Sequence, residues 1–311
     1  MNNNEFAKCL SGRDKFLILT HKNPDGDTVG SACALCSALR RKGKTAYLYP
    51  NRQINRKLMP YAEPLFAPDG YTPGCVLSVD IATEELFPLG FQGKAELCVD
   101  HHPTNSHFAK KELIKPERSA CGEIVLDLIK TLCGKPNREE ATLLYIALTT
   151  DTGCFQYANV NARSFSAAAE LVGYGADNRK VSLDFFRKVS DARIKLEGLI
   201  YSSMEYYRDG ALTVATVTND MLKKAGATED DCDDLAGLPG RAENSIVSVT
   251  IKETKDGKSK ISVRSNPGVS SSDICAVFGG GGHDMAAGCT ISSPPDKAKE
   301  MLLAVIDELW K

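Results

Sequence analysis

Short apolar runs alternate with helical patterns through the first half of the chain. Residues 16–19, 76–79 and 97–99 are mostly apolar runs of strand length, which are typical of strands covered on both faces. After the first run, apolar residues recur at helical spacing over residues 29–39, and residues 45–49 resume a strand. This strand–loop–helix–strand order predicts an α/β domain with a parallel sheet.

Three later helices are expected in the same half. Ser119 is placed to cap the first of them. Asn137, with Glu140 three residues further on, has the pattern of a capping box before a helix that leads to Asp151. An alanine-rich helix is expected over residues 161–174.

From Leu212 onward the apolar pattern changes to period two. Alternation over residues 212–217, 247–251 and 261–263 predicts strands, with a hairpin turn at Asp256-Gly257. A final helix is expected to begin at Pro294-Pro295. Its apolar face would consist of Ala298, Met301, Leu302, Val305, Ile306 and Leu309.

These patterns predict an α/β chain of two domains. Residues 1–188 would form the parallel-sheet domain, and residues 189–208 would form a linker helix. Residues 209–311 would form a smaller domain with a mixed sheet.

Composition narrows the class of protein. A net charge of −2 argues against a protein that follows polyanions by bulk attraction. The N-terminus lacks signal-peptide features, and no run of 18 apolar residues is present, so a cytoplasmic location is expected. The eleven cysteines are odd in number and scattered through apolar runs, which favours reduced thiols. Even Cys33 and Cys36, at C-x-x-C spacing, lie on the expected buried stripe of a helix.

The residues that could carry chemistry gather where these strands and helices end. They are His21, Asp25, Asp27, Asp80, His101 and Asp151. Such ends lie along one edge of an open α/β sheet, so one pocket would collect these carboxylates and imidazoles. Crowded carboxylates cannot all stay ionised without a compensating cation. Imidazole and carboxylate ligands without thiolate favour Mn²⁺, with Mg²⁺ or Co²⁺ as substitutes. The pattern therefore predicts two metal ions that hold a hydroxide for attack at phosphorus.

Individual residues take different roles in this hypothesis. Asp80 is expected to bridge both ions. His102 is placed to contact phosphoryl oxygens or to protonate the leaving oxygen, and Asp100 to orient an imidazole. Taken singly, such residues are more often caps, turn residues or surface groups. Their joint position at sheet exits is what favours a site, and His107 lies outside it.

The second half of the chain offers candidate substrate-binding residues. Arg264 alternates with core-facing residues and so faces away from the core. The run Gly279–Gly282 lets a backbone approach a phosphate closely, and successive N–H groups can form an anion-binding nest. His283 follows directly and could bond a phosphate or a base. The candidates are Arg264, Ser265, Gly281, Gly282 and His283.

Four of these segments resemble the motifs of the DHH phosphoesterase superfamily: residues 21–27, 80, 100–102 and 151–153. Residues 279–288 resemble the signature of the DHH-associated C-terminal domain, so the resemblance covers nearly the whole chain. The closest architecture is that of the NrnA-type nanoRNases and pAp phosphatases. One departure is Gln156, where members of the superfamily often carry a basic residue.

This resemblance implies the ligands of each metal. One manganese would be held by His21, Asp25 and Asp80. The other would be held by Asp27, Asp80, His101 and Asp151, with His102 contacting the phosphate.

The resemblance also implies a manganese-dependent phosphoesterase with its active site in the cleft between the domains. It would hydrolyse short oligoribonucleotides to 5′-mononucleotides and 3′-phosphoadenosine 5′-phosphate (pAp) to AMP. The C-terminal domain would hold the terminal nucleotide. Short RNA or a small nucleotide is the expected partner, without duplex DNA or a membrane, and a homodimer stays open.

Several alternatives remain at this point. The same site could serve a phosphodiesterase for linear or cyclic dinucleotides such as pApA and cyclic di-AMP. A manganese pyrophosphatase would need a cluster of basic residues in its second domain, where we find Arg264 and a glycine-rich loop. A non-catalytic nucleotide-binding protein would keep the scaffold without turnover. A long-strand exonuclease is disfavoured, because the chain has neither an extra strand-binding domain nor a positive net charge.

Overall fold

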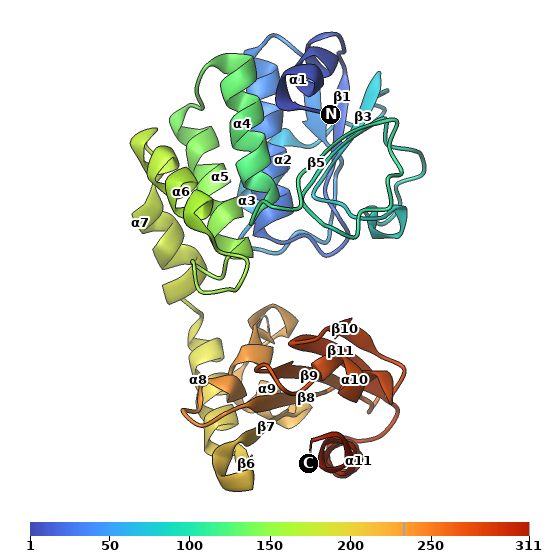
Figure 1. The fold of residues 1–311 in the computed structure, drawn as a ribbon, viewed down its shortest axis with the longest axis vertical. Helices are drawn as coiled ribbons and strands as arrows, with labels where there is room; N and C mark the ends of the chain where they lie inside the picture. Colours follow the sequence, from blue (N-terminus) through green and yellow to red (C-terminus); the bar gives the residue numbers. More distant parts are fainter. Residues whose placement is uncertain (233, 311) are drawn as a thin grey trace. The chain divides into compact units, whose positions relative to one another are not determined.

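A computed structural model describes residues 1–232 and 234–310 (Figure 1). Its contacts separate two compact units, Met1–Lys188 and a second one that begins at Val189. In these described residues, no helix combines the length and the apolar character needed to cross a bilayer.

The first unit contains a five-stranded sheet in the described residues, with strand order β2-β1-β3-β4-β5 and every neighbouring pair parallel. The strands are β1 (Phe16–Leu19), β2 (Ala46–Leu48), β3 (Cys75–Val79), β4 (Leu97–Asp100) and β5 (Lys111–Ile114). The helices are α1 (Asn3–Ser11), α2 (Gly26–Arg41), α3 (Met59–Ala62), α4 (Cys121–Cys133), α5 (Arg138–Asp151), α6 (Ala162–Gly173) and α7 (Asn178–Val181), followed by the π-helix η3 (Ser182–Arg187). This confirms the predicted parallel α/β architecture.

Strand β1 shows why its apolar run is uninterrupted. Phe16 and Ile18 belong to the main core of the unit, beneath the helices, whereas Leu17 and Leu19 join a smaller cluster. Loop aromatic residues pack against that smaller cluster on the other face. Alternate side chains of a strand point to opposite faces, so a strand covered on both sides must be apolar throughout.

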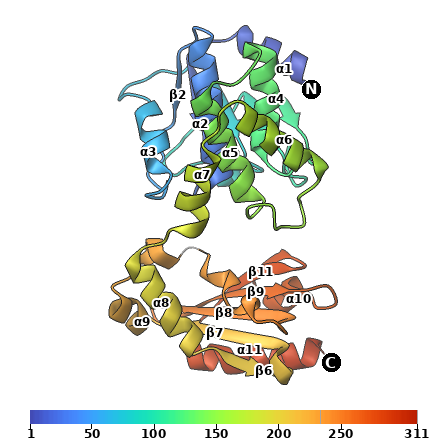
Figure 2. The same cartoon turned by 90° about the vertical axis from the view of Figure 1, so that its left-hand side faces the viewer.

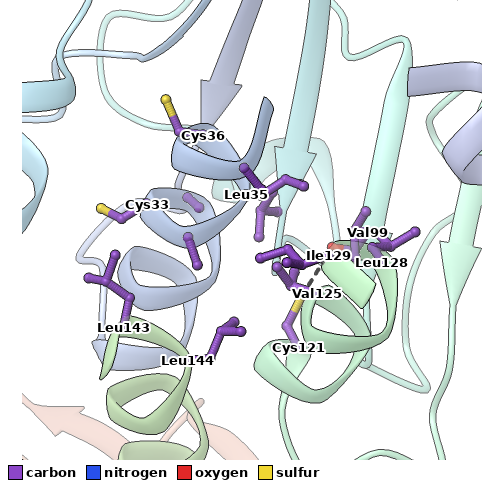
Figure 3. Close-up of a cluster of buried hydrophobic side chains, with 14 of the residues drawn as sticks. Cys33, Leu35, Cys36, Val99, Cys121, Val125, Leu128, Ile129, Leu143 and Leu144 are labelled. Atoms are coloured by element: carbon purple, nitrogen blue, oxygen red, sulfur yellow. Dashed lines mark hydrogen bonds between the residues drawn. The ribbon is translucent and has the colours of Figure 1, made fainter. Parts of the chain in front are cut away.

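The main core lies where α2, α4 and α5 meet (Figure 3). Cys33 and Cys36 are buried there as free thiols. Burial raises the pKa of Cys36 to about 12 and that of Cys33 further, which disfavours the thiolate forms that would bind a metal or react. All eleven cysteines lie in the described residues and are free.

Helices α2 and α5 approach closely because small residues line their contact. A Cβ atom at Gly30 would lie 2.4 Å from the carbonyl oxygen of Leu143, and one at Gly26 would lie 2.3 Å from Oγ1 of Thr150. Both distances are below van der Waals contact, so only glycine fits without displacing α5. The end of α5, which carries Asp151, is thereby held beside the start of α2.

Two features of the first unit differ from the sequence prediction. Ser119 is not the cap of α4: the capping position is Ala120, and the Ser119 hydroxyl instead donates to the carbonyl of Asn159. A side chain from another helix, described below, takes over the cap. Strand β5, whose residues are mostly half exposed at the edge of the sheet, has no clear apolar pattern.

The second unit contains a mixed sheet, again as predicted. The strands are β6 (Glu205–Tyr207), β7 (Leu212–Val217), β8 (Val247–Glu253), β9 (Ser259–Ser265), β10 (Gly281–His283) and β11 (Ala286–Ile291), in the order β10-β11-β9-β8-β7-β6. In the described part of the chain, β7 and β8 pair in parallel and the other neighbours pair antiparallel. The helices are α8 (Asp191–Ser202), α9 (Asn219–Ala225), α10 (Ser271–Ala276) and α11 (Pro295–Leu309). Figure 2 shows this unit from the side of α8.

Helix α8 begins close to the predicted start of the linker. It ends at Ser202, and the chain then enters β6 instead of continuing as helix. Leu196 and Ile200 are buried in a hydrophobic cluster with residues of β7 and α9, so the contacts group this helix with the second unit. In α11, by contrast, Met301 and Leu309 of the expected apolar face are exposed.

We predict that Gly30→Ala lowers the free energy of unfolding by about 1–3 kcal/mol, because the added methyl group overpacks the contact between α2 and α5. Urea unfolding followed by circular dichroism measures the change. Gly173→Ala is the matched control, since a Cβ atom at Gly173 meets nothing within 4 Å. Equal unfolding midpoints for wild type and Gly30→Ala would contradict the close packing.

Candidate active site

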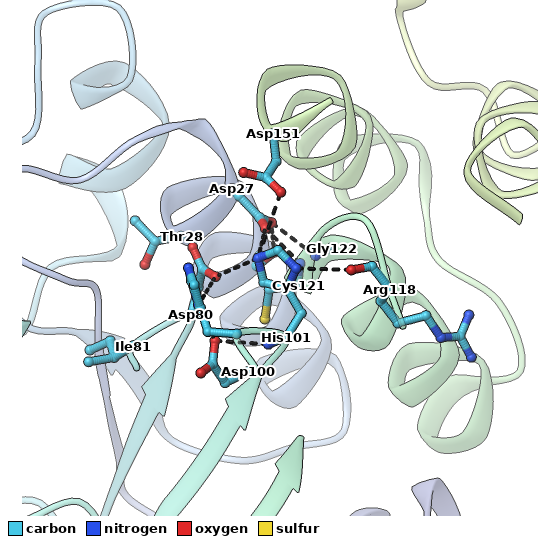
Figure 4. Close-up of polar contacts among 12 residues, drawn as sticks. Asp27, Thr28, Asp80, Ile81, Asp100, His101, Arg118, Cys121, Gly122 and Asp151 are labelled. Carbon is cyan, nitrogen blue, oxygen red and sulfur yellow. Dashed lines mark hydrogen bonds and ion pairs between the residues drawn. The ribbon is translucent and has the colours of Figure 1, made fainter. Parts of the chain in front are cut away.

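The carboxyl ends of β1, β3 and β4 lie side by side in the sheet, and each leads into a site residue. Asp80 directly follows β3, His101 directly follows β4, and His21 lies two residues beyond β1. Two helices add carboxylates: Asp27 stands in the first turn of α2, and Asp151 is the last residue of α5. Figure 4 shows the carboxylates of Asp27, Asp80 and Asp151 gathered around the imidazole of His101.

His101 and His21 are oriented in the same way. Nδ1 of His101 donates to the carbonyl oxygen of Arg118 at 3.0 Å, and Nδ1 of His21 donates to that of Lys22 at 2.8 Å. A carbonyl oxygen can only accept, so each Nδ1 carries a proton. The Nε2 atom of each ring is then free to bind a cation, and in both rings it faces the carboxylates.

Asp80 lies between the two histidines. Its Oδ1 is 3.5 Å from Nε2 of His101, and its Oδ2 is 3.9 Å from Nε2 of His21. The residue is 3% exposed and has a left-handed backbone (φ 60°). This conformation is uncommon for residues other than glycine and is found mostly at functional sites. Its buried Oδ1 has no hydrogen-bond partner among the described residues. A buried carboxylate oxygen without a partner fits a site built for a cation.

Asp27 connects the site to α4. The carboxylate accepts from the backbone N–H of Cys121 at 2.6 Å and of Gly122 at 2.9 Å, and from Ser31 at 2.9 Å. Asp27 therefore caps α4 in place of the predicted Ser119. Its Oδ2 also lies 3.8 Å from Nε2 of His101.

Asp25 and Asp151 lie at the ends of the cluster. Asp25 caps α2 by accepting from the N–H groups of Asp27 and Thr28, and its Oδ1 is 3.6 Å from Nε2 of His21. Asp151 places Oδ2 at 3.7 Å from Nε2 of His101. Two groups of donors result: His21 with Asp25 and Asp80, and His101 with Asp27 and Asp151.

The electrostatics of this cluster fit divalent cations. Burial, together with the charge of Asp151, raises the pKa of Asp27 to about 7. Burial likewise raises the pKa of Asp151 to about 6, and burial plus the neighbouring carboxylates raise that of Asp80 well above its usual value. Burial lowers the pKa of His101, but the charges of Asp27 and Asp151 outweigh it and raise the pKa. The raised pKa values mean that these carboxylates bind protons more readily than usual. Bound divalent cations would compensate the same negative charge.

His102 stands in a different relation to the cluster. Its Nδ1 donates to Oδ1 of Asp100 at 2.7 Å, and the side chain is 41% exposed. Burial opposes ionisation of Asp100, but the hydrogen bonds from His102 and Asn105 outweigh it and lower the pKa of Asp100. Nδ1 of His102 also lies 3.7 Å from Asp80, within a third group that could hold a metal. Because Nδ1 is engaged by Asp100, only Nε2 remains available. Asp100 therefore orients an imidazole, as the sequence hypothesis requires.

The sequence does not point to several supporting residues. Asn51 holds the backbone of His21 by donating to its carbonyl oxygen at 2.9 Å, and Asn159 donates to the carbonyl oxygen of Asp151 at 3.1 Å. The side chain of Arg118 is paired with Asp127 at 3.1 Å, which fixes the carbonyl that orients His101. Isolated asparagines and arginines carry no motif, so only their position in the fold identifies them. His107, expected to lie outside the site, pairs with Glu112 at 2.8 Å.

In the second unit, the candidate substrate-binding residues lie on β9 and β10. Arg264 is exposed, as predicted, and Ser265 is buried with its hydroxyl bonded to the carbonyl of Val269 at 2.7 Å. Residues Gly281–His283 form the exposed edge strand β10.

The glycine run differs from the expected nest. The N–H groups of Gly279 and Gly280 donate to carbonyl oxygens at the end of α10, so they are not free for an anion. A Cβ atom at Gly280 would lie 2.3 Å from the carbonyl oxygen of Gly288, and one at Gly282 would lie 2.5 Å from that of Ala286. These glycines permit the close approach of β10 and β11.

Comparison with known proteins agrees with this architecture. Residues 15–148 match the DHH family, N-terminal domain, and residues 209–311 match the DHHA1 domain. A bifunctional oligoribonuclease and PAP phosphatase NrnA from Thermus thermophilus is 34% identical over 307 residues, 98% of this chain and 92% of that protein. The protein of the same name from Bacillus subtilis is 26% identical over 322 residues, 99% of this chain and 98% of its own. A crystal structure of an exopolyphosphatase-related protein from Bacteroides fragilis has the same fold, with a TM-score of 0.88 and 23% identity over 98% of this chain and 95% of that one.

We predict that Mn²⁺ at about 100 times its dissociation constant stabilises the protein by about 2.7 kcal/mol. For a unit of the size of Met1–Lys188, which carries the cluster, that corresponds to an increase in Tm of about 5–10 °C. Asp80→Asn should abolish most of this increase. In EDTA the same variant should be at least as stable as wild type, because it removes a buried charge while asparagine tolerates the left-handed backbone.

Differential scanning fluorimetry with and without Mn²⁺ measures both effects. Asp69→Asn, at an exposed acidic position, is the matched control and should respond to the metal like wild type. A full response of Asp80→Asn to Mn²⁺ would contradict a metal role for Asp80.

Proposed function

The chain belongs to the DHH family of phosphoesterases, and we propose that it hydrolyses short oligoribonucleotides to 5′-mononucleotides and pAp to AMP in a manganese-dependent reaction. The observation that carries the proposal is the convergence of two histidine–carboxylate groups on Asp80, whose buried Oδ1 has no hydrogen-bond partner among the described residues. The substrates are supported by the names of the relatives that match nearly the whole chain.

We propose that two cations bind at this cluster. His21, Asp25 and Asp80 would hold one ion, and Asp27, Asp80, His101 and Asp151 would hold the other. When bound, the pair of cations would supply an activated water and compensate the charge that develops on the phosphoryl group. Manganese suits the mixture of imidazole nitrogen and carboxylate oxygen without thiolate, and Mg²⁺ or Co²⁺ could replace it.

The protein's own groups prepare the site for this reaction. The carbonyls of Lys22 and Arg118 keep both Nε2 atoms directed at the carboxylates. The bonds of Asp27 to the start of α4 prevent its carboxylate from turning away. Such preorganisation means that little rearrangement is needed as charge develops at phosphorus.

His102 is proposed as the general acid. Its Nδ1 is bonded to Asp100, which fixes the ring and leaves Nε2 for proton transfer. A proton on the exposed Nε2 can then pass to the oxygen that leaves phosphorus: the 3′ oxygen of AMP from pAp, or the oxygen of the departing chain in an oligonucleotide. The same group can contact phosphoryl oxygens before the transfer.

The second unit is proposed to bind the part of the substrate that does not react. The exposed guanidinium of Arg264 is suited to a phosphate, and the exposed His283 to a phosphate or a base. Gly281, where a Cβ atom would meet nothing within 4 Å, leaves room for a nucleotide against β10, and Gly282 lets that strand lie close to β11. Ser265 supports this region from inside, because its hydroxyl is bonded within the unit. We also propose a cytoplasmic location, supported by eleven free thiols.

An assay with Mn²⁺ tests the function directly. Wild type and Asp80→Ala are compared on pAp, an RNA 5-mer, pApA, cyclic di-AMP and pyrophosphate. We expect turnover of pAp and the 5-mer that is lost in the variant. Turnover of dinucleotides alone would move the function to a dinucleotide phosphodiesterase, and turnover of pyrophosphate alone to a pyrophosphatase. No turnover of any of the five would overturn the proposal.

We predict that His102→Gln lowers kcat by about 10²–10⁴-fold through loss of the general acid. Asp100→Asn should lower kcat in the same direction but by less, since it leaves the imidazole in place. Both variants should keep the Mn²⁺-dependent increase in Tm, which separates proton transfer from metal binding. Loss of that increase in His102→Gln would instead make His102 a metal ligand.

A further inference from the structure

A cavity of about 460 Å³ lies in the first unit, between the end of α5, the loop that follows it and the α7–η3 helix. Thr149 and Cys154 form one wall, and Arg179, Ser182, Phe186 and Arg187 contribute to the other. The volume is within the usual range for sites that hold a small organic ligand, about 300–1,000 Å³. None of the residues considered so far for metal, proton transfer or substrate lines it.

The charged side chains that line this cavity are all positive. Its lining includes two arginines and no aspartate or glutamate. In the part of the chain that the structure describes, neither Arg179 nor Arg187 makes an ion pair or a side-chain hydrogen bond. Other arginines of the unit, such as Arg41 and Arg163, are paired with carboxylates. Two unpaired guanidinium groups beside one cavity favour an anionic ligand, and phosphate suits their geometry.

The helix that presents these side chains is unusual. Residues Ser182–Arg187 form a π-helix, in which the N–H of Lys188 donates to the carbonyl of Leu183 at 2.7 Å. π-Helical turns are rare and occur frequently at functional sites. Phe186 lines the cavity together with Arg179 and Arg187. An aromatic ring beside guanidinium groups offers a base a stacking surface next to its phosphate.

The cavity also adjoins the metal-binding cluster through the chain. Thr149 lies two residues before Asp151, and Cys154 lies three residues after it. In the turn after Asp151, which includes Cys154 of the cavity wall, Gly153, Cys154 and Phe155 all have positive φ values, of 54°, 56° and 66°. Two of these residues are not glycine, so the backbone is strained at the turn that separates cluster and cavity.

We propose that this cavity is a nucleotide subsite that binds a phosphate and base of an oligoribonucleotide away from the bond that is hydrolysed. The inference rests on the proposed function and adds a determinant of substrate length. A 5-mer has nucleotides beyond the reacting phosphate that can reach the subsite. A single nucleotide such as pAp, with its phosphate at the metals, has none to place there.

Kinetics of the double variant Arg179→Ala/Arg187→Ala test this subsite. We expect the ratio of KM for the 5-mer to KM for pAp to rise about tenfold or more, because phosphate contacts and stacking are lost only for the longer substrate. Phe186→Ala should shift the ratio in the same direction. The matched control is Lys42→Ala/Lys135→Ala, which removes two charges beyond the far ends of α2 and α4. Its ratio should equal that of wild type.

Direct binding keeps the inference testable if turnover fails. Fluorescence anisotropy of a labelled RNA 5-mer is measured in EDTA, where no hydrolysis occurs, after circular dichroism has shown that each variant is folded. Weaker binding by the arginine variant than by the lysine control supports the subsite even if wild type hydrolyses neither substrate, in which case only the proposed function fails. An unchanged KM ratio, or equal 5-mer binding by the two double variants, would overturn the subsite.

Discussion

The buried negative charge around Asp80 is the constraint on which the first unit depends. Asp27 and Asp80 are nearly inaccessible to water, yet they lie beside one another and beside Asp151. Burying a carboxylate charge that nothing compensates costs free energy, so each carboxylate must be protonated, hydrogen-bonded or bound to a cation. The fold meets part of the requirement with backbone N–H groups at the start of α4. Oδ1 of Asp80 has no hydrogen-bond partner among the described residues, and an unpaired buried carboxylate oxygen is suited to a cation.

The need to compensate these carboxylates also bears on the roles that we propose for three histidines. His21 and His101 each donate Nδ1–H to a backbone carbonyl, which is neutral and leaves Nε2 as a ligand. His102 donates to the carboxylate of Asp100. In all three rings the bond at Nδ1 fixes the orientation of the imidazole and leaves Nε2 available. The different roles that we propose for the adjacent residues His101 and His102 rest on their positions. Nε2 of His101 lies 3.5–3.8 Å from three carboxylates, whereas the side chain of His102 is 41% exposed.

Much of this arrangement could be predicted from the sequence, for a physical reason. Parallel strands end at a common edge, so His21, Asp80 and His101 had to meet once the strands were recognised. The cap of α4 could not be predicted in the same way. Ser119 has the right chemistry and position along the chain, but Asp27 reaches the helix from another element. The glycine run shows the same limit, since the pairing of β10 with β11 decides which N–H groups remain free.

The packing of α5 explains why site and cavity can be coupled. Gly26 and Gly30 let α5 lie close to α2, and this contact sets the position of Asp151 at the end of the helix. The turn after Asp151 is strained, and a strained backbone persists only where the surrounding structure determines it.

On one side of that turn lie the carboxylates, whose negative charge requires a positive partner. On the other stand Arg179 and Arg187, which require negative charge. An oligonucleotide, with phosphates at regular spacing, can meet both needs. One phosphate would face the carboxylates through the bound cations, and another would contact the two arginines directly. A mononucleotide meets only the first, and this difference in charge is the physical basis of the discrimination by substrate length that we propose.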